Sequence, residues 1–374
     1  MDNITMEPTV PLPIPPRAPP HADAGNLVWL RKNLFAGWKN TVATLLILAV
    51  LLALLPAFID WAVLKAVWSP DNAACRALAQ HGACWGVIAE KYRVILFGRY
   101  PFEQQWRPMV ATVLLVSMVV ASCTRWLWSR WLVLVWVVML AAVFLLMGGG
   151  VAGLSRVGTA NWGGLPLTVM LSTFSIGLAF PLAILLALGR LSKLPAIRSL
   201  CTVYIELIRG VPLISVLFMA SFMFPLFMPR GFSIDVLVRV LAGISLFTAA
   251  YLAEVVRAGI QAVPRGQLEA AATIGLNYWQ TQRKIVLPQA LRQVVPSIMN
   301  SFISTFKDTS LVIIVSLYEL TGGLTLAIAG DAQWRQFYLE GYLFIAAIYW
   351  VFCYAMSRYS RWVEAYLNRG NRRL

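Results

Sequence analysis

Long, uninterrupted apolar runs dominate the pattern of hydrophobic and polar positions along this chain. A helix of about 20 apolar residues crosses a hydrocarbon core of roughly 30 Å, and eight runs reach or approach that length. They occupy residues 42–64, 109–123, 131–149, 165–188, 200–227, 236–260, 298–317 and 341–356. The runs do not alternate with a period of two, which excludes a closed β-barrel. The pattern predicts an all-α polytopic membrane protein of about eight transmembrane helices.

Composition and charge support this class. The chain of 374 residues is 59% hydrophobic and 13% charged, whereas soluble proteins carry about 25% charged residues. The 31 basic and 16 acidic side chains give a net charge of +15. The basic residues stand between the apolar runs and not on one amphipathic face, so they indicate membrane topology and not a nucleic-acid partner.

The distribution of Lys and Arg predicts the orientation. With eight spans, 19 of the 31 basic residues fall on the side of both termini and 9 on the opposite side, and the other three lie within spans. Because cytoplasmic loops carry the excess of Lys and Arg, both termini are expected in the cytoplasm.

Three regions are expected along the chain. Residues 1–40 form a cytoplasmic tail, whose first 25 residues hold seven of the 20 prolines and no apolar run. This composition predicts disorder, and the tail lacks the apolar segment of a signal peptide. Residues 41–160 form an extension of three spans with an external loop at 65–108. Residues 161–374 form the core, with a cytoplasmic loop at 261–297.

The cysteines and histidines offer one disulfide candidate and no metal site. Cys75 and Cys84 bracket a short stretch of the external loop, where thiols oxidise readily. A disulfide between them is the favoured interpretation and two free thiols the alternative. The other three cysteines lie in apolar runs, where a thiol is usually a small buried hydrophobe. Only two histidines, His21 and His81, are present, so no zinc or haem ligand set is expected.

The loop between the sixth and seventh spans is the most informative segment. It reads EAAATIGLNYWQTQRKIVLPQAL from Glu269. Two short helices, one ended by a glycine and one stopped near Pro288, would account for its composition. They do not account for its spacing, in which a Glu-Ala-Ala triplet, a glycine and an Ile-x-Leu-Pro group stand at set distances. The fixed positions are Glu269, Ala270, Ala271, Gly275, Ile285, Leu287 and Pro288.

This spacing resembles the coupling loop of permease subunits of binding-protein-dependent ATP-binding-cassette importers. Further segments, YIELIRGVPL, AAYLAEVVRAGIQAVPRGQ and SFISTFKDTSLV, resemble the polar amino acid permeases of the histidine and glutamine type. The resemblance covers a five-helix core from residue 165 to the C-terminus. The WRP and LFG sequences of the external loop resemble one permease subunit of the general L-amino acid importers.

The resemblance implies a function and a set of partners. In that family the short helix after the EAA docks in a cleft of the ATPase, and small residues, one charge and a glycine suit such docking. No GxxxxGK[ST] phosphate loop occurs here, so the chain is expected to be no enzyme and to hold no cofactor, and a partner ATPase dimer would bind ATP and Mg. A second permease subunit, most readily in a heterodimer, a periplasmic amino-acid-binding protein and an L-amino acid substrate are the other implied partners. The implied location is the bacterial inner membrane.

Ionisable residues within two spans are candidates for the substrate path. On the fifth span, Glu206 and Arg209 lie three residues apart and can pair on one helix face. Gly210 and Pro212 follow them, where helical hydrogen bonding is weakened. The seventh span carries Lys307, Asp308, Thr309 and Ser310.

These clusters offer both charges that a zwitterionic amino acid requires. The alternative is that their charges neutralise each other and only lock the helices together. Broad specificity would follow if adaptable side chains lined the rest of the pocket. The candidates are Met219, Phe222 and Met223.

Two rival classes remain. An ion-coupled secondary transporter of amino acids would account for charges inside apolar spans, but it leaves the EAA loop without a role, and no second half of the chain repeats the first. A membrane-embedded enzyme requires a convergent nucleophile, acid and base or a metal set, and none is visible.

Overall fold

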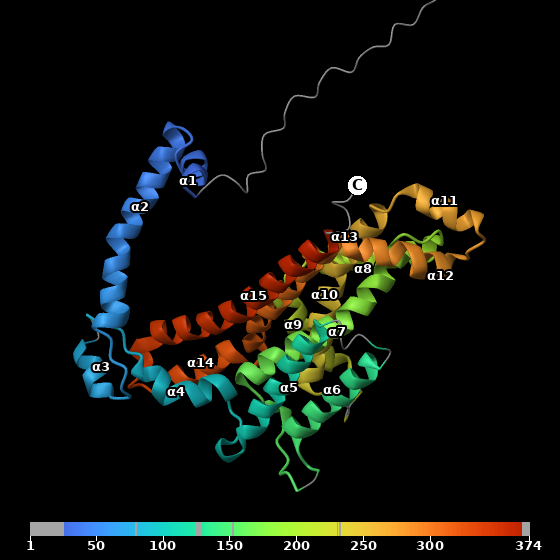
Figure 1. The fold of residues 1–374 in the computed structure, drawn as a ribbon. Coiled ribbons are helices and arrows are strands. Elements are labelled where there is room, and N and C mark those ends of the chain that lie inside the picture. Colours follow the sequence, from blue (N-terminus) through green and yellow to red (C-terminus); the bar gives the residue numbers. More distant parts are fainter. Residues whose placement is uncertain are drawn as a thin grey trace, which may run out of the picture. The chain divides into compact units, whose positions relative to one another are not determined.

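The computed structural model describes residues 26–78, 81–124, 129, 131–151, 153–229, 231 and 233–368. Most of the proline-rich tail, the C-terminal residues 369–374, and three basic residues of the charge count, Arg125, Arg130 and Arg230, lie outside the described residues. Across the described ranges every named element is a helix, in agreement with the predicted all-α class (Figure 1).

The chain divides into two compact units, which we call the N-terminal unit and the core unit. The N-terminal unit comprises Met1–Ala66 and Gln80–Ala83, and the core unit comprises Val67–Ala79 and Cys84–Leu374. In the N-terminal unit, α1 (Asn26–Leu34) precedes α2 (Trp38–Ile59), which continues as a π-helical turn, η2 (Asp60–Leu64). No residue of α2 is buried. A helix that is apolar on all sides is typical of a membrane span, as the run at 42–64 predicts.

The core unit contains thirteen α-helices among the described residues, joined by short 3₁₀ and π segments. They are α3 (Asn72–Leu78), α4 (Gly86–Phe97), α5 (Trp106–Ser122), α6 (Leu132–Gly148), α7 (Gly164–Arg190), α8 (Pro195–Arg209), α9 (Leu213–Phe218), α10 (Val236–Gln261), α11 (Arg265–Thr273), α12 (Tyr278–Thr281), α13 (Leu287–Asp308), α14 (Leu320–Ala329) and α15 (Tyr338–Asn368). The short segments are η3 (Phe102–Gln104), η5 (Thr159–Asn161), η6 (Met219–Met223), η7 (Phe224–Phe227), η8 (Gln282–Val286), η9 (Thr309–Val315) and η10 (Arg335–Phe337).

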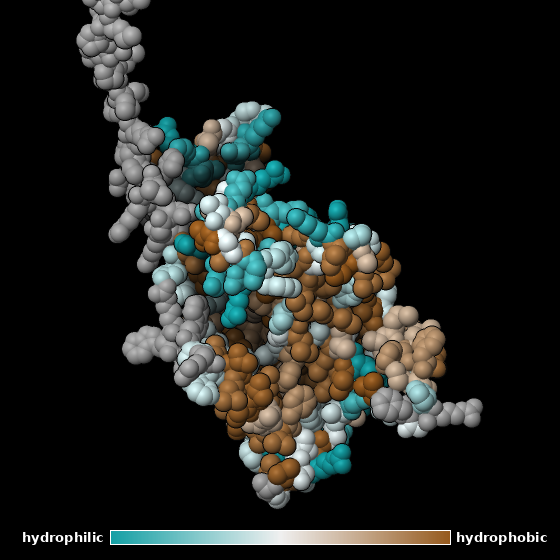
Figure 2. Space-filling model, turned by 90° about the vertical axis from the view of Figure 1, so that its right-hand side faces the viewer, coloured by the Kyte–Doolittle hydropathy of each residue, from teal (hydrophilic) through white to brown (hydrophobic). Residues whose placement is uncertain are grey.

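The centre of the core unit is the packing of α7 against α10. Alanines from both helices, Ala179, Ala183, Ala249 and Ala253, are fully buried in one cluster. Small side chains let membrane helices approach closely, so that dispersion contacts hold them together where lipid offers no hydrophobic driving force. Figure 2 shows one face of the molecule, on which hydrophobic side chains cover the middle and hydrophilic ones lie toward the top of the view and at its lower end.

Six described helices are long and apolar enough to cross a membrane, and a seventh span follows if the bent pair of α8 with residues 213–227 is counted as one. Helix α6, with 17 residues, is shorter than a typical span. The expected count of eight is therefore approximate. Helix α14 is a further short apolar helix, which lies between the seventh and eighth runs and is not predicted by the run pattern.

The bend between α8 and α9 measures 105°. Pro212 stands in extended backbone with ψ 144°, and the chain leaves α8 at Gly210. A proline lacks the N–H that would continue the helix and its ring clashes with the preceding turn. The carbonyl of Arg209, freed by the break, accepts a hydrogen bond from the Tyr251 hydroxyl at 3.4 Å.

Helices α5 and α6 belong to the same hydrophobic core as α7. Ala111 and Leu115 of α5 and Val143 of α6 are fully buried together with Leu167 and Leu171. The expected extension at 41–160 is therefore not one structural piece, because its last two helices pack on the core unit and its first helix lies in the N-terminal unit.

Arg107, in the WRP sequence, explains how α6 ends. This side chain is only 1% exposed, and its guanidinium donates to the carbonyls of Leu146 at 2.7 Å and Ser155 at 3.0 Å. It also donates to the carbonyl of Met147 at 3.4 Å. The last carbonyls of a helix have no partner within it, and a cation there is stabilised by the helix dipole.

Glu319 is a second buried ionisable residue that orders helix ends. It is 0% exposed, and its carboxylate accepts from the backbone N–H groups of Thr321 and Gly322 at the start of α14. It also accepts from Thr168 of α7 at 3.1 Å and Tyr349 of α15 at 2.8 Å. One side chain thus joins three helices.

A disulfide joins Cys75 and Cys84, whose Cα atoms lie 5.4 Å apart. Both residues are buried beside Trp334 and Phe337, in the connection between α14 and α15. The N–H of Cys84 donates to Glu340 at 2.9 Å. The disulfide therefore links α3 to the start of α4, and the packing on Trp334 and Phe337 and the bond to Glu340 hold this link against the residues around the start of α15.

Candidate functional site

The EAA triplet lies on α11, a short helix between the two long helices α10 and α13. Glu269 and Ala270 are exposed, whereas Ala271 is 1% exposed. Helix α11 contacts η8, the π-helical turn that precedes α13. The triplet therefore presents the carboxylate of Glu269 and the methyl group of Ala270 to the outside, whereas the methyl group of Ala271 is buried.

Gly275 ends α11 in a left-handed conformation, with φ +76°. The N–H of Leu276 donates to the Ala271 carbonyl at 3.1 Å, and the N–H of Gly275 donates to the Ala272 carbonyl at 3.0 Å. These two bonds are the Schellman arrangement, which satisfies the last carbonyls of a helix. Glycine is the residue that adopts this conformation without steric cost, so the fixed glycine of the motif has a structural reason.

Asn277 then starts α12 with a reciprocal capping box. Its side chain accepts from the N–H of Gln280, and the Gln280 side chain accepts from the N–H of Asn277. Pro288 does not stop a helix, which corrects the simple two-helix interpretation of this loop. It lies in the first turn of α13, where a missing N–H is tolerated. Next to it, the side chain of Gln289 donates to the carbonyl of Ile285 at 3.0 Å.

Two bulky side chains that the motif does not include are the most exposed apolar groups of this loop. Ile274 is 71% exposed and Trp279 is 66% exposed, on either side of Gly275. Exposed apolar groups rimmed by polar residues mark interaction surfaces. We call the segment from Arg265 to Trp279 the coupling segment. Reasoning from the spacing missed Ile274 and Trp279, although their position beside the fixed glycine is visible in the sequence.

The candidate substrate-path residues of the fifth span do not pair with each other. Glu206 of α8 accepts instead from Arg190 of α7 at 2.7 Å. Arg190 also binds Glu254 of α10 at 3.0 Å, and the Glu254 carboxylate is shared with Arg257. We call these four residues the charge cluster. The spacing of Glu206 and Arg209 allows one ion pair within α8. Arg190 instead forms two ion pairs with carboxylates of neighbouring helices, which is the more favourable arrangement.

Arg209 lies against an aromatic ring. Its guanidinium carbon is 5.5 Å from the centroid of the Tyr251 ring, a cation–π distance. The Nε atom of Arg209 is buried without a hydrogen-bond partner. Buried polar groups are normally satisfied, so this unsatisfied donor next to the bend between α8 and α9 is an exception among the described residues.

The seventh-span candidates sit where α13 gives way to the 3₁₀ segment η9. Lys307 is exposed, Asp308 and Ser310 are half-buried and Thr309 is buried, with its hydroxyl donating to the Phe306 carbonyl at 2.7 Å. In the part of the chain that the structure describes, no hydrogen bond or ion pair joins this cluster to Glu206 or Arg209. The two sets of candidates are therefore not in direct polar contact with each other.

The adaptable side chains expected near the site belong to a π-helical turn. Met219, Phe222 and Met223 lie in η6, and Met219 and Phe222 are about half exposed. Arg239 of α10 donates to the carbonyls of Ala220 and Ser221 in this turn. A π-helical turn disturbs the regular ladder of bonds, and Arg239 satisfies the carbonyls that it frees.

Arg190, Glu254 and Arg257 are the charged residues that reasoning from single spans missed. Glu254 and Arg257, three residues apart near the end of the sixth run, are an available signal. The ion pairs of Arg190 could not be predicted from the sequence, because its partners come from two other helices. Among the described residues, no group of His, Cys, Asp and Glu side chains could hold a metal ion.

Comparison with known proteins places this arrangement among transport components. A family model described as "Binding-protein-dependent transport system inner membrane component" matches residues 179–369. This range contains the coupling segment, the charge cluster and both substrate-path candidates.

Two relatives match over nearly the whole chain. "Inner membrane amino-acid ABC transporter permease protein YhdY" of Escherichia coli is 45% identical over 95% of this chain and 97% of its own length. "Glutamate/glutamine/aspartate/asparagine transport system permease protein BztC" of Rhodobacter capsulatus is 35% identical over 96% and 97%. A solved structure, described as "Crystal structure of an amino acid ABC transporter with histidines", is 29% identical over 54% of this chain and 91% of its own, with a TM-score of 0.47.

Proposed function

Because this chain belongs to the family of inner membrane components of binding-protein-dependent transport systems, we propose that it is the permease subunit of an ATP-driven amino acid importer. The observation that carries the proposal is the coupling segment, an exposed helix and turn between two spans inside the matched range. An ion-coupled secondary transporter is not supported, since nothing in that mechanism uses this segment. The chain is a transport component and not itself an enzyme.

The coupling segment docks on a cytoplasmic ATPase. Glu269 and Ala270 form its outer face, and Ile274 and Trp279 supply apolar area at its edge. Ala271 ties the segment to η8 and so to α13, and residues 262–264 join it directly to α10. A displacement of α11 is therefore transmitted to both α10 and α13. ATP and Mg are bound and ATP is hydrolysed in that partner.

The other partners follow from the family. A periplasmic binding protein delivers the amino acid, and a second permease subunit completes the translocation path, in a heterodimer. The external segment with α3, α4 and the Cys75–Cys84 disulfide braces the binding protein or the second permease. Both termini lie in the cytoplasm, and the protein is a multi-pass component of the inner membrane.

The substrate path passes the bend between α8 and α9. Arg209, whose Nε has no hydrogen-bond partner among the described residues, lies on α8 directly before the bend and supplies a cation for the carboxylate of an amino acid. Lys307 and Asp308 line the path from the end of α13. The charge cluster holds α7, α8 and α10 together at one end of this path. Met219, Phe222 and Met223 accommodate varied side chains.

Reconstitution with the partner subunits tests the function. Proteoliposomes should take up labelled amino acids only when ATP and the binding protein are both supplied. Uptake driven by a proton or sodium gradient without ATP would refute the proposal.

Arg209→Gln and Lys307→Gln test the path separately from the function. Both variants should assemble with the ATPase, and Arg209→Gln should lower uptake because it removes the cation that the substrate carboxylate requires. Wild-type uptake of acidic, neutral and basic amino acids by both variants would place the path elsewhere.

A further inference from the structure

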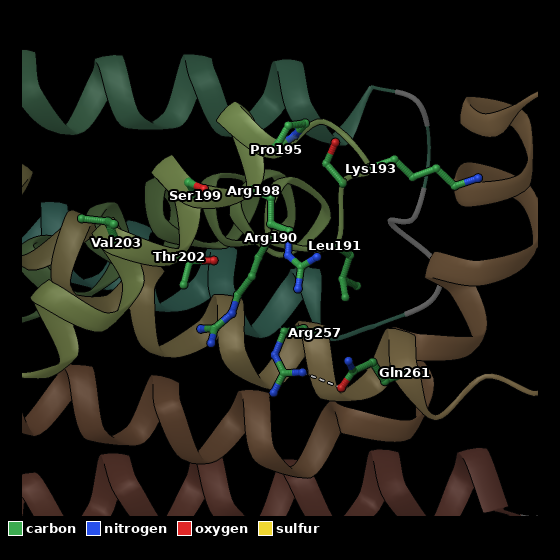
Figure 3. Close-up of a pocket in the computed structure, with 11 residues that line it drawn as sticks. Arg190, Leu191, Lys193, Pro195, Arg198, Ser199, Thr202, Val203, Arg257 and Gln261 are labelled. Atoms are coloured by element: carbon green, nitrogen blue, oxygen red, sulfur yellow. Dashed lines mark hydrogen bonds between the residues drawn. The ribbon is translucent and has the colours of Figure 1, made fainter.

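Three helix ends meet around a cavity of about 690 Å³ in the core unit. Arg190 is the last residue of α7, Gln261 is the last residue of α10, and Pro195 is the first residue of α8, and all three line the cavity (Figure 3). The other lining residues are Leu191, Ser192, Lys193, Arg198, Ser199, Thr202, Val203 and Arg257.

The lining carries a surplus of positive charge. Arg190 and Arg257 are matched by the carboxylates of Glu206 and Glu254. Lys193 and Arg198 have no ion-pair partner among the described residues. Figure 3 shows Arg190, Arg198 and Arg257 gathered together, whereas Lys193 extends away from them. Arg198 is therefore the surplus cation nearest the middle of the group, and Lys193 lies at the rim.

The backbone adds to this charge. Helix α8 has 15 residues, and no side chain caps its N-terminus. The N-terminus of a helix presents free N–H groups and the positive end of the helix dipole. Ser192, Ser199, Thr202 and Gln261 supply neutral hydrogen-bonding groups around it. Phosphate oxygens in proteins typically accept hydrogen bonds from guanidinium groups, backbone N–H groups and hydroxyls.

The cavity lies at the level of the membrane surface. Helices α7 and α10 have 27 and 26 residues, which corresponds to about 40 Å at 1.5 Å per residue, whereas the hydrocarbon core is roughly 30 Å thick. Their ends therefore reach the headgroup region. The basic residues place this end on the side predicted to be cytoplasmic.

An apolar stripe leads from the cavity along α8. Leu200, Val203 and Leu207 are 73%, 63% and 65% exposed, and their spacing of three and four places them on one face of the helix. Val203 itself lines the cavity. A free phosphate ion in the cavity would make no contact with this stripe. The acyl chains of a lipid whose phosphate occupies the cavity would lie along it.

The geometry points to a binding site for an anionic phospholipid, with its phosphodiester held by Arg198, Lys193 and the start of α8 and its acyl chains against the α8 stripe. Charged residues near a membrane surface each contribute about fivefold to the affinity for anionic lipid. The site is separate from the coupling segment and does not depend on the proposed transport function.

The test uses the full-length chain purified in detergent. Native mass spectrometry measures binding of phosphatidylglycerol, of phosphatidylcholine and of inorganic phosphate. The double variant Lys193→Gln/Arg198→Gln is compared with the control Arg361→Gln, which removes an exposed cation of α15 outside the cavity. We expect preferential binding of phosphatidylglycerol, a loss of about tenfold or more in the double variant, and no loss in the control.

Three results would overturn the assignment. Equal binding of phosphatidylcholine would show that charge plays no part, and equal binding of inorganic phosphate would show that the ligand is a free anion. If the double variant kept its phosphatidylglycerol but no longer copurified with its ATPase, the cavity would be a docking site for an acidic protein segment.

Discussion

The coupling segment turns at Gly275. The conformation of this residue allows the strain that a substitution causes in the backbone to be distinguished from a steric clash of the added side chain. An added Cβ at Gly275 would meet no atom within 4 Å, yet φ is +76°. Any substitution there is therefore strained by the backbone alone, at a cost of roughly 1 kcal/mol or more.

Gly275→Ala should lower ATP-dependent uptake several-fold while membrane insertion stays normal, because the turn after α11 relaxes away from its docked geometry. Gly275→Asp should have a larger effect, since it adds a charge beside Ile274. Gly266→Ala is the matched control: Gly266 lies within α11 with open space around it and no positive φ, so alanine there should be neutral or slightly stabilising. Uptake and ATP hydrolysis are measured in parallel for each variant. Equal uptake per ATP hydrolysed by Gly275→Ala and Gly266→Ala would contradict the coupling role of Gly275.

Arg107 gives a second prediction at the scale of one residue. Arg107→Leu leaves the carbonyls of Leu146 and Ser155 without their donor, and hydrogen bonds to a charged group are worth about 1.5 to 3 kcal/mol. The variant should therefore unfold at a clearly lower temperature in detergent, and Arg107→Lys should recover part of the loss. Arg156→Leu is the control, since that exposed side chain makes no ion pair or hydrogen bond among the described residues. An unchanged melting temperature of Arg107→Leu would contradict the capping role.

At the scale of elements, the segment that contains α3 and α4 depends on the disulfide between α3 and the residue before α4. In the chain-entropy model, a disulfide that closes a loop of about ten residues contributes roughly 2 to 3 kcal/mol. Cys75→Ser/Cys84→Ser should therefore loosen α3, with proteolysis near residue 80 as the readout, while ATP-dependent uptake is reduced only if this segment braces a partner.

Peptide mapping without reductant is the direct check on the disulfide itself. Recovery of Cys75 and Cys84 as free thiols from protein isolated under oxidising conditions would contradict it. The remaining described cysteines, Cys123, Cys201 and Cys353, are free and provide the internal control for alkylation.

At the scale of the whole molecule, the division into units predicts where the chain tolerates truncation. Removal of residues 1–66 takes away the N-terminal unit apart from residues 80–83 and leaves the buried clusters of the core unit intact. Removal of residues 1–150 also takes α3 to α6, and the loss of α5 and α6 exposes Leu167 and Leu171. The shorter truncation should remain monodisperse in size-exclusion chromatography, and the longer one should aggregate. Equal stability of the two would show that α5 and α6 are not needed to cover this part of the core unit.

Local signals in the sequence determined the class of the protein and its most informative segment. Run length alone separates a membrane bundle from a soluble fold, because a bilayer sets the length of a span. The coupling segment was readable because its residues are consecutive: the turn at Gly275 and the cap at Asn277 are formed by neighbours in the chain. The break after Arg209 was visible for the same reason, since a glycine and a proline act on their own backbone.

Tertiary structure alone decided which distant residues meet. Glu206 has a near neighbour of opposite charge in Arg209, yet it pairs with Arg190, because packing of α7 against α8 and α10 brings a guanidinium between two carboxylates. The burial of Arg107 and Glu319, the attachment of α5 and α6 to the core, and the cavity at three helix ends are likewise consequences of helix packing. Contacts between two helices depend on which faces of the helices meet and at what depth in the membrane. The apolar pattern of a span specifies neither the face nor the depth, because lipid and protein neighbours favour the same apolar side chains.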